Sequence, residues 1–189
     1  MAFVRSETER TELFHKLFHE NFLYVCACLR RFGVHASDVE DAAHEVFLTA
    51  YRRLESLVTV SSPRPWLARI AYLTALSSRQ RTERRVEVTD PGAMPEPEDH
   101  RQRPDKLLEL EEERSLVLHT LQSIPADRRV VFVMHDIDGH DIPEIATLLS
   151  IPLNTAYSRL RLARAEFRDA IERATRRDMP LTRLGLLKG

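Results

Sequence analysis

Residues 141–168, DIPEIATLLSIPLNTAYSRLRLARAEFR, decide the fold of this 189-residue chain. Apolar residues recur at helical spacing on both sides of residues 150–153, where a proline keeps the chain from continuing as one helix. Asp141 is predicted to cap the first helix and Asn154 the second. Ala146 is small where two crossing helices must approach closely. Two helices joined by so short a turn form a helix-turn-helix, whose second helix enters the major groove of DNA.

The second helix of this motif carries side chains suited to DNA. Arg161, Arg164 and Arg168 recur at spacings of three and four and give one basic face. Polar groups gather at its N-terminal end, where groove-entering helices read base edges. A solvated basic face on a packing helix is the alternative, which the caps, the turn and Ala146 make less favourable. The predicted DNA contacts are Asn154, Thr155, Tyr157, Ser158, Arg161 and Arg164.

Two further helices precede the motif, at about residues 106–123 and 127–137, and residues 138–140 form a turn. Apolar spacing predicts that the second of these helices buries Val130, Val131, Val133 and Met134. In the first 81 residues, three more helices are expected. The first carries Phe14, Phe18 and Phe22. The second is predicted to begin with a capping box of Ser37 and Glu40, and the third has Pro65 in its first turn.

A flexible acidic linker is predicted at residues 82–105. It contains four prolines and no apolar periodicity, and residues 82–113 hold eleven acidic against five basic residues. Such sequence cannot bury enough apolar surface to offset its ordering entropy. The fold class expected is therefore all-α: two small helical domains, residues 1–81 and 106–175, joined by this linker. Residues 176–189 form a C-terminal tail.

Composition excludes several classes of protein. No run approaches the roughly 20 apolar residues of a membrane span, and the first residues lack the apolar core of a signal peptide. We therefore expect a cytoplasmic protein without direct membrane insertion. The chain has no nucleophile elbow, Gly-rich phosphate loop or paired carboxylates in an apolar setting. It is not predicted to be an enzyme, and no cofactor is expected.

A zinc site is the one metal-binding alternative. His15 and His19 lie four residues apart, and Cys26 and Cys28 follow on the same helix, so a metal-sensing switch is conceivable. The histidines flank an apolar stripe, however, and the cysteines lie two to three turns further on. Packing is the preferred interpretation of all four, and no metal site is predicted.

Both domains together resemble the extracytoplasmic-function group of RNA polymerase sigma factors. The resemblance rests on residues 124–129 (IPADRR), 141–146 (DIPEIA) and 154–164 (NTAYSRLRLAR) in the second domain. In the first domain it rests on residues 38–47 (DVEDAAHEVF) and 66–71 (WLARIA). The match covers both domains, in the family's order.

The resemblance implies a role for each domain and its partners. The first domain would bind the core RNA polymerase and melt the minus-ten promoter element, capturing the non-template strand. The second would read double-stranded DNA at the minus-thirty-five element. A membrane-bound anti-sigma factor is a further expected partner. The implied polymerase contacts are Asp38, Asp41, Glu45, Phe47 and Arg52. The implied minus-ten contacts are Trp66, Arg69, Tyr72, Leu73 and Arg81, although a lone tryptophan at the start of a helix is more commonly core.

Several positions depart from the family pattern. Leu73 and Ser77 stand where Asn and Asp are common, and Ala156 and Tyr157 stand where Val and Lys are usual. The first two changes remove polar contacts to the melted strand, and Tyr157 suggests a distinct minus-thirty-five sequence. A transcription regulator that never joins polymerase is the alternative function. It would need a ligand pocket or phosphoacceptor in the first domain, for which the sequence has no pattern. The leucines at residues 181–187 are interpreted as part of a frayed terminus. Packing on the second domain or binding to a partner is the alternative.

Overall fold

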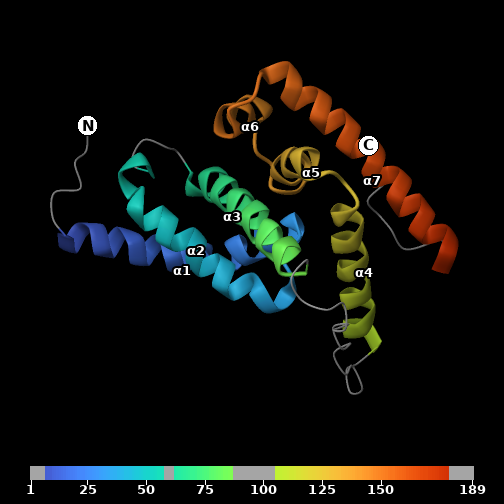
Figure 1. Ribbon diagram of the computed structural model, residues 1–189, viewed down its shortest axis with the longest axis horizontal. Helices are drawn as coiled ribbons and strands as arrows, with labels where there is room; N and C mark the ends of the chain where they lie inside the picture. Colours follow the sequence, from blue (N-terminus) through green and yellow to red (C-terminus); the bar gives the residue numbers. More distant parts are fainter. Residues whose placement is uncertain (1–6, 58–61, 87–104, 179–189) are drawn as a thin grey trace.

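The computed structural model describes residues 7–57, 62–86 and 105–178 (Figure 1). Every regular element in these ranges is helical, which confirms the all-α prediction. The helices are α1 (Glu7–Phe32), α2 (Val39–Arg52), α3 (Pro63–Val86), α4 (Asp105–Gln122), α5 (Ala126–Phe132), α6 (Ile142–Leu149) and α7 (Leu153–Asp178). Short 3-10 turns lie at Ala36–Asp38 and Leu54–Leu57, and a π-helical turn at Val133–Ile137 continues α5.

The boundaries of the predicted linker differ somewhat from the helix ends. Helix α3 extends to Val86, five residues into the range 82–105, and α4 begins at Asp105. Residues 87–104 of the linker and residues 179–189 of the tail lie outside the described residues. Within the described residues, no helix is both long enough and apolar enough to cross a membrane.

Helices α1, α2 and α3 pack together as lobe one (Figure 1). The predicted apolar stripe of α2 forms its centre, and Ala43, Val46 and Ala50 are fully buried. Three phenylalanine rings of α1 surround Phe47, with ring centroids 4.7–6.4 Å from it. Aromatic contacts of this kind add to the area they bury. Lobe one therefore has a core of its own, with the aromatic cluster where the first half of α1 meets the last turns of α2.

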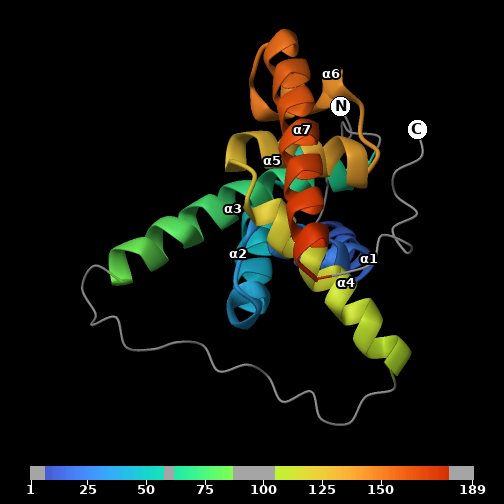
Figure 2. The same cartoon turned by 90° about the vertical axis from the view of Figure 1, so that its right-hand side faces the viewer.

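Helices α4 to α7 form lobe two, in which α7 packs across α5 and also contacts α4 and α6 (Figure 2). The prediction of four buried residues in the second helix of this lobe is confirmed. Each has at most 1% of its surface exposed: Val130, Val131, Val133 and Met134. They pack with Ile145, Ala156 and Leu160, which are also buried. The helix-turn-helix predicted from residues 141–168 is thus present and shares one core with α5.

Two helices end with a residue in the left-handed region. Gly33 follows α1 with φ of 97°, and the amide of Val34 donates to the carbonyl of Leu29 at 3.0 Å. Ser150 follows α6 with φ of 55°, and the amide of Ile151 donates to the carbonyl of Ala146 at 3.0 Å. Both are the six-to-one bonds of a Schellman motif, which turns the chain sharply after the helix. The second of them makes the turn of the helix-turn-helix.

The side-chain caps predicted at three helix starts were wrong. Asp141 occupies the N-cap of α6, but its side chain makes no capping hydrogen bond. Helix α7 begins at Leu153, so Asn154 lies inside its first turn. Before α2, a 3-10 turn intervenes, in which the imidazole of His35 accepts from the amide of Ser37. At α7, the fixed backbone geometry of Pro152 and of the preceding turn replaces a side-chain cap as the start signal.

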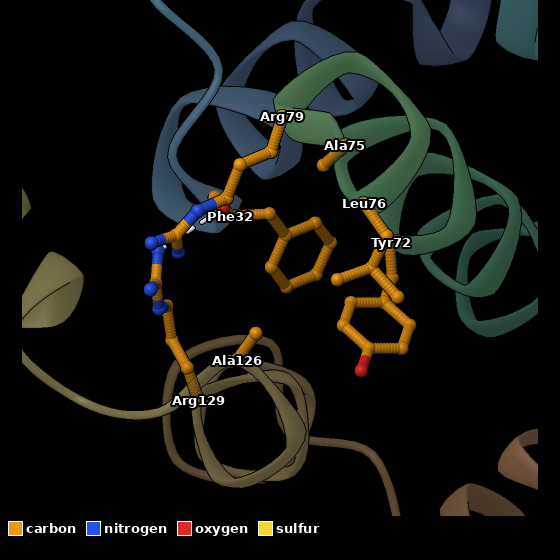
Figure 3. Close-up of a pocket in the computed structure, with 7 residues that line it drawn as sticks. All are labelled: Phe32, Tyr72, Ala75, Leu76, Arg79, Ala126 and Arg129. Carbon is orange, nitrogen blue, oxygen red and sulfur yellow. Dashed lines mark hydrogen bonds between the residues drawn. The ribbon is translucent and has the colours of Figure 1, made fainter. Parts of the chain in front are cut away.

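The lobes contact each other, α1 against α4 and α5, and α3 against α6. Arg129 of α5 lies in this boundary with only 2% of its surface exposed, beside Arg79 of α3 (Figure 3). Its guanidinium donates to the carbonyls of Gln122, the last residue of α4, and of Ile124 just beyond it, and to that of Phe32 at the end of α1. Burial, together with the positive charge of Arg79, lowers its pKa to about 10, so it stays a cation at neutral pH. One buried cation therefore satisfies the carbonyl ends of two helices, one in each lobe.

Candidate nucleic-acid interface

The N-terminal part of α7 presents a mixed polar and apolar face to solvent. Asn154, Tyr157, Ser158 and Arg161 are exposed, with Tyr157 at 53%. The opposite face, with Ala156, Leu160 and Ala163, is buried against α5 and α6. Thr155 is half-buried at the edge of the exposed face. The face is about one helix wide and convex, which is the shape a major groove admits.

Two of the arginines on α7 are held by carboxylates of lobe two. Arg164 makes a two-pronged ion pair with Asp136, at 2.7 and 2.6 Å. Arg159 pairs with Asp127 at 3.2 Å on the other flank of the helix. These pairs add to the contacts that hold α7 on lobe two, whose buried side chains orient the helix. They also occupy guanidinium groups that would otherwise be available to phosphate.

Arg161 differs from these two arginines. It is exposed, and among the described residues no hydrogen bond or ion pair to it is found. It lies between Tyr157 and Arg164 along the helix, on the solvent side. The predicted basic face of three arginines is therefore not uniform. Arg161 has a guanidinium directed to solvent, whereas that of Arg164 is turned to Asp136.

The predicted minus-ten residues of α3 divide between core and surface. Trp66 is buried, as its alternative interpretation held, so it cannot contact a base without rearrangement. Leu73 and Arg81 are exposed, and Arg69 is half-buried. Tyr72 packs its ring edge-on against Phe32, with centroids 5.8 Å apart. Burial raises the pKa of Tyr72, and the carboxylate of Asp127 in lobe two adds to the effect.

The predicted polymerase-binding residues of α2 lie mostly on its outer face. Asp38, Asp41, Glu45 and Arg52 are exposed. Phe47 is 2% exposed and belongs to the aromatic cluster, so its assignment as a surface contact was wrong. The apolar spacing of α2 had already predicted that Phe47 is buried, and only the family resemblance implied that it contacts the polymerase.

Glu45 and Arg81 link the two predicted faces of lobe one. The guanidinium of Arg81 donates to both carboxylate oxygens of Glu45, at 3.0 and 2.8 Å. This hydrogen bonding lowers the pKa of Glu45. Because both side chains are about half exposed, the pair contributes little to stability. Its effect is to hold the far part of α3 against α2.

Leu48 is a candidate contact that the sequence interpretation missed. It is 57% exposed on the outer face of α2, between the charged side chains of that face. The signal was available, because position 48 lies half a helical turn from the buried stripe of Val46 and Ala50. An exposed leucine ringed by charges is typical of the centre of a protein interface with a polar rim.

Comparison with known proteins gives two family matches. "Sigma-70 region 2" matches residues 17–85, and "Sigma-70, region 4" matches residues 114–167. The chain is 32% identical over 152 residues to the ECF RNA polymerase sigma-E factor of Escherichia coli K12, covering 76% of this chain and 79% of that protein. It is also 32% identical over 151 residues to the RNA polymerase sigma-H factor of Pseudomonas aeruginosa, covering 76% of each.

Two solved structures share the fold. One is the sigma factor RpoE in complex with the anti-sigma factor NepR from Bartonella quintana, with a TM-score of 0.62 at 15% identity, covering 84% of this chain and 96% of that one. The other is CnrH in complex with the cytosolic domain of CnrY, with a TM-score of 0.55 at 22% identity, covering 85% and 88%. At these identities the likeness concerns the fold.

Proposed function

Because this chain belongs to the extracytoplasmic-function (ECF) family of RNA polymerase sigma factors, we propose that its two lobes divide promoter recognition between them. The family consists of transcription initiation factors and not of enzymes. Lobe one, within residues 1–81, binds core polymerase and melts the minus-ten element. Lobe two, within residues 106–175, reads the minus-thirty-five element. The observation that carries the proposal is the order of region 2 and region 4 in one chain, each coinciding with one helical lobe.

The outer face of α2 is the proposed polymerase-binding surface. Its centre is Leu48, and its rim consists of Asp38, Asp41, Glu45 and Arg52. An apolar centre contributes most of the binding energy, while a charged rim speeds association and selects the partner. Glu45 reaches this surface while bound to Arg81, so the rim is partly preorganised.

Replacing Leu48 with arginine is expected to weaken binding to bacterial core polymerase about 10- to 100-fold. The change puts a charge that must be desolvated where the interface is apolar, a loss of about 1.4–2.8 kcal/mol. Fluorescence titration of labelled protein with core polymerase measures it. Leu23→Arg is the matched control, since Leu23 is 81% exposed on α1 outside the proposed surface. Equal affinities of the two variants would show that the outer face of α2 is not the contact.

The exposed end of α7 is the proposed reader of the minus-thirty-five element. Asn154 and Ser158 are placed to contact base edges or phosphates, and Arg161 to contact a phosphate or a guanine. The Ser158 hydroxyl donates to the Thr155 carbonyl at 2.9 Å, so it would offer DNA an acceptor. Tyr157 adds an exposed ring suited to a thymine methyl group. Arg164 lies beside this surface and is paired with Asp136, so it supports α7 and contacts DNA only when that pair opens.

The exposed face of α3 is the proposed surface for the melted strand. Leu73 and Arg81 are accessible, whereas Tyr72 and Arg69 are partly covered. Trp66 supports this face from within the core. An apolar Leu73 offers packing against an unstacked base without a polar contact, so base selection there depends on neighbouring groups.

An anti-sigma factor is the proposed regulatory partner. Both solved structures of similar fold are complexes, one with the cytosolic domain of CnrY and one with the anti-sigma factor NepR. A protein of that kind would cover the polymerase-binding surface of lobe one, the exposed face of lobe two, or both. A polymerase subunit works where the chromosome lies, so we place the protein in the cytoplasm.

A further inference from the structure

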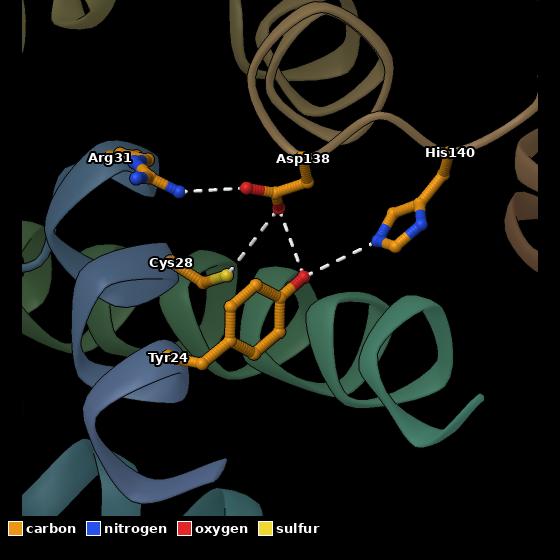
Figure 4. A network of polar contacts seen from close by, with 5 residues as sticks. All are labelled: Tyr24, Cys28, Arg31, Asp138 and His140. Atoms are coloured by element: carbon orange, nitrogen blue, oxygen red, sulfur yellow. Dashed lines mark hydrogen bonds and ion pairs between the residues drawn. The ribbon is translucent and has the colours of Figure 1, made fainter.

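Asp138 is a buried carboxylate that joins the two lobes (Figure 4). It follows the π-helical turn of lobe two, and its side chain is 5% exposed. Arg31 donates to Oδ1 at 2.8 Å, and the Tyr24 hydroxyl donates to Oδ2 at 2.9 Å. The Cys28 thiol also donates to Oδ2, at 3.8 Å. All three donors lie on α1 of lobe one, so this carboxylate is satisfied by the opposite lobe.

The surroundings of Asp138 support the same contact. The Tyr24 hydroxyl lies 3.4 Å from Nε2 of His140, which also belongs to lobe two. Arg64 of α3 stacks its guanidinium over the Tyr24 ring, 5.2 Å from the centroid. At the end of α1, Arg129 donates to the Phe32 carbonyl at 3.0 Å. Helix α1 thus receives an anion on its side and a cation at its C-terminus, both from lobe two.

Such an arrangement is incompatible with reading a whole promoter. This step rests on the proposed function, in which one lobe binds near minus ten and the other near minus thirty-five. About 25 base pairs at ~3.4 Å each separate these elements by roughly 85 Å. A lobe of about 80 residues has a radius of gyration of roughly 12 Å, so two touching lobes cannot reach both sites.

We propose that Asp138, held by Tyr24, Cys28 and Arg31, is the latch of a closed resting state that must open before the factor engages both promoter elements. Opening breaks three hydrogen bonds to the carboxylate, and hydration of the exposed carboxylate offsets part of that loss, so the net free energy of the latch is within reach of a partner's binding. The fraction of open molecules then scales the apparent affinity for a promoter. Weakening the latch raises that fraction.

The distance between lobes in the free, full-length protein tests the latch. Spin labels at Glu12→Cys and Arg168→Cys, both exposed positions, report it by double electron–electron resonance. The background is Cys26→Ser, Cys28→Ser, in which the serine hydroxyl keeps a hydrogen-bond donor at position 28 and the two shorter contacts, from Tyr24 and Arg31, are unchanged. The background protein is expected to give one narrow distance distribution. Asp138→Arg, which puts a cation against Arg31, is expected to broaden this distribution, with more than half of the molecules outside the original peak. Adding Arg31→Asp, which restores the ion pair in reverse, is expected to return the narrow peak.

The matched control is Asp169→Arg, the same charge change at an exposed aspartate of α7. It is expected to leave the distance unchanged. A narrow peak that persists in Asp138→Arg, or a broad distribution already present in the background protein, overturns the latch. Neither result touches the sigma-factor assignment, which stands or falls on transcription with core polymerase.

The Cys28 thiol gives a second readout if Asp138→Arg loses helical content. Burial, with the added charge of Asp138, raises the pKa of Cys28 to about 12, so the thiol stays protonated. In Cys26→Ser protein, Tyr24→Phe removes a single hydroxyl of the latch and is expected to speed alkylation of Cys28 about tenfold. An unchanged alkylation rate overturns the proposal as surely as an unchanged distance.

Discussion

Replacing Arg129 with methionine is expected to lower the free energy of unfolding by about 3–5 kcal/mol. The guanidinium is almost fully buried and donates to carbonyl oxygens of Gln122, Ile124 and Phe32. Methionine keeps most of the volume but leaves these carbonyls without donors in a buried place, at about 1–3 kcal/mol for each group that water cannot reach. The loss is spread over the ends of α4 and α1, so it affects both lobes.

Urea unfolding followed by circular dichroism measures this loss. Arg128→Met is the matched control, since Arg128 is the neighbouring arginine of α5 and pairs with Glu166 at a half-buried site. Its loss is expected to stay below about 1 kcal/mol. If Arg129→Met also lowers the free energy of unfolding by less than about 1 kcal/mol, water and not the guanidinium satisfies the carbonyl groups at the two helix ends.

Charge reversal at Arg161 is expected to lower affinity for minus-thirty-five duplex DNA about 100-fold, or about 2.7 kcal/mol. Arg161 is exposed on the outer face of α7, and no partner for it is found within the described residues. Glutamate there removes a contact worth about 1–3 kcal/mol and places an anion against the phosphates. The slope of log affinity against log salt is expected to become shallower by about one.

Fluorescence anisotropy at several salt concentrations measures the affinity of Arg161→Glu for duplex DNA and the dependence of that affinity on salt. Arg173→Glu is the control, because Arg173 is exposed on the same helix but lies three turns further from its N-terminus. That variant is expected to bind within about twofold of the unsubstituted protein. If the two variants bind equally well, the exposed end of α7 is not the DNA-reading surface.

The helix-turn-helix could be predicted from sequence because its signals are local. Proline in the turn, a small residue at the crossing and apolar spacing over residues 141–168 fixed α6 and the start of α7 to within a residue or two. The predicted caps failed because Asx and Ser side chains compete with other local bonds, and here backbone geometry ended and began the helices. Family resemblance then supplied the roles that periodicity cannot.

The contacts between lobes could not be predicted in the same way. Asp138 is separated from Arg31 by 107 residues and reads in sequence as an ordinary turn residue before a glycine. Arg129 stands beside another arginine in a charged stretch that looks solvent-exposed, yet its side chain is buried. The Phe32 carbonyl to which it donates lies 97 residues away in the sequence. Long-range polar contacts have no periodicity, so only the fold reveals them.

Transcription by bacterial core RNA polymerase, reconstituted with this protein and a library of randomised promoters, tests the central claim most directly. The selected templates are expected to share two sequence blocks, near minus thirty-five and minus ten, and to be silent with core polymerase alone. Arg161→Glu is expected to weaken selection of the upstream block and Leu48→Arg to lower initiation throughout. If core polymerase neither binds the protein nor starts at selected sites, while the protein still binds DNA, the chain acts as a regulator outside the polymerase and the account is contradicted.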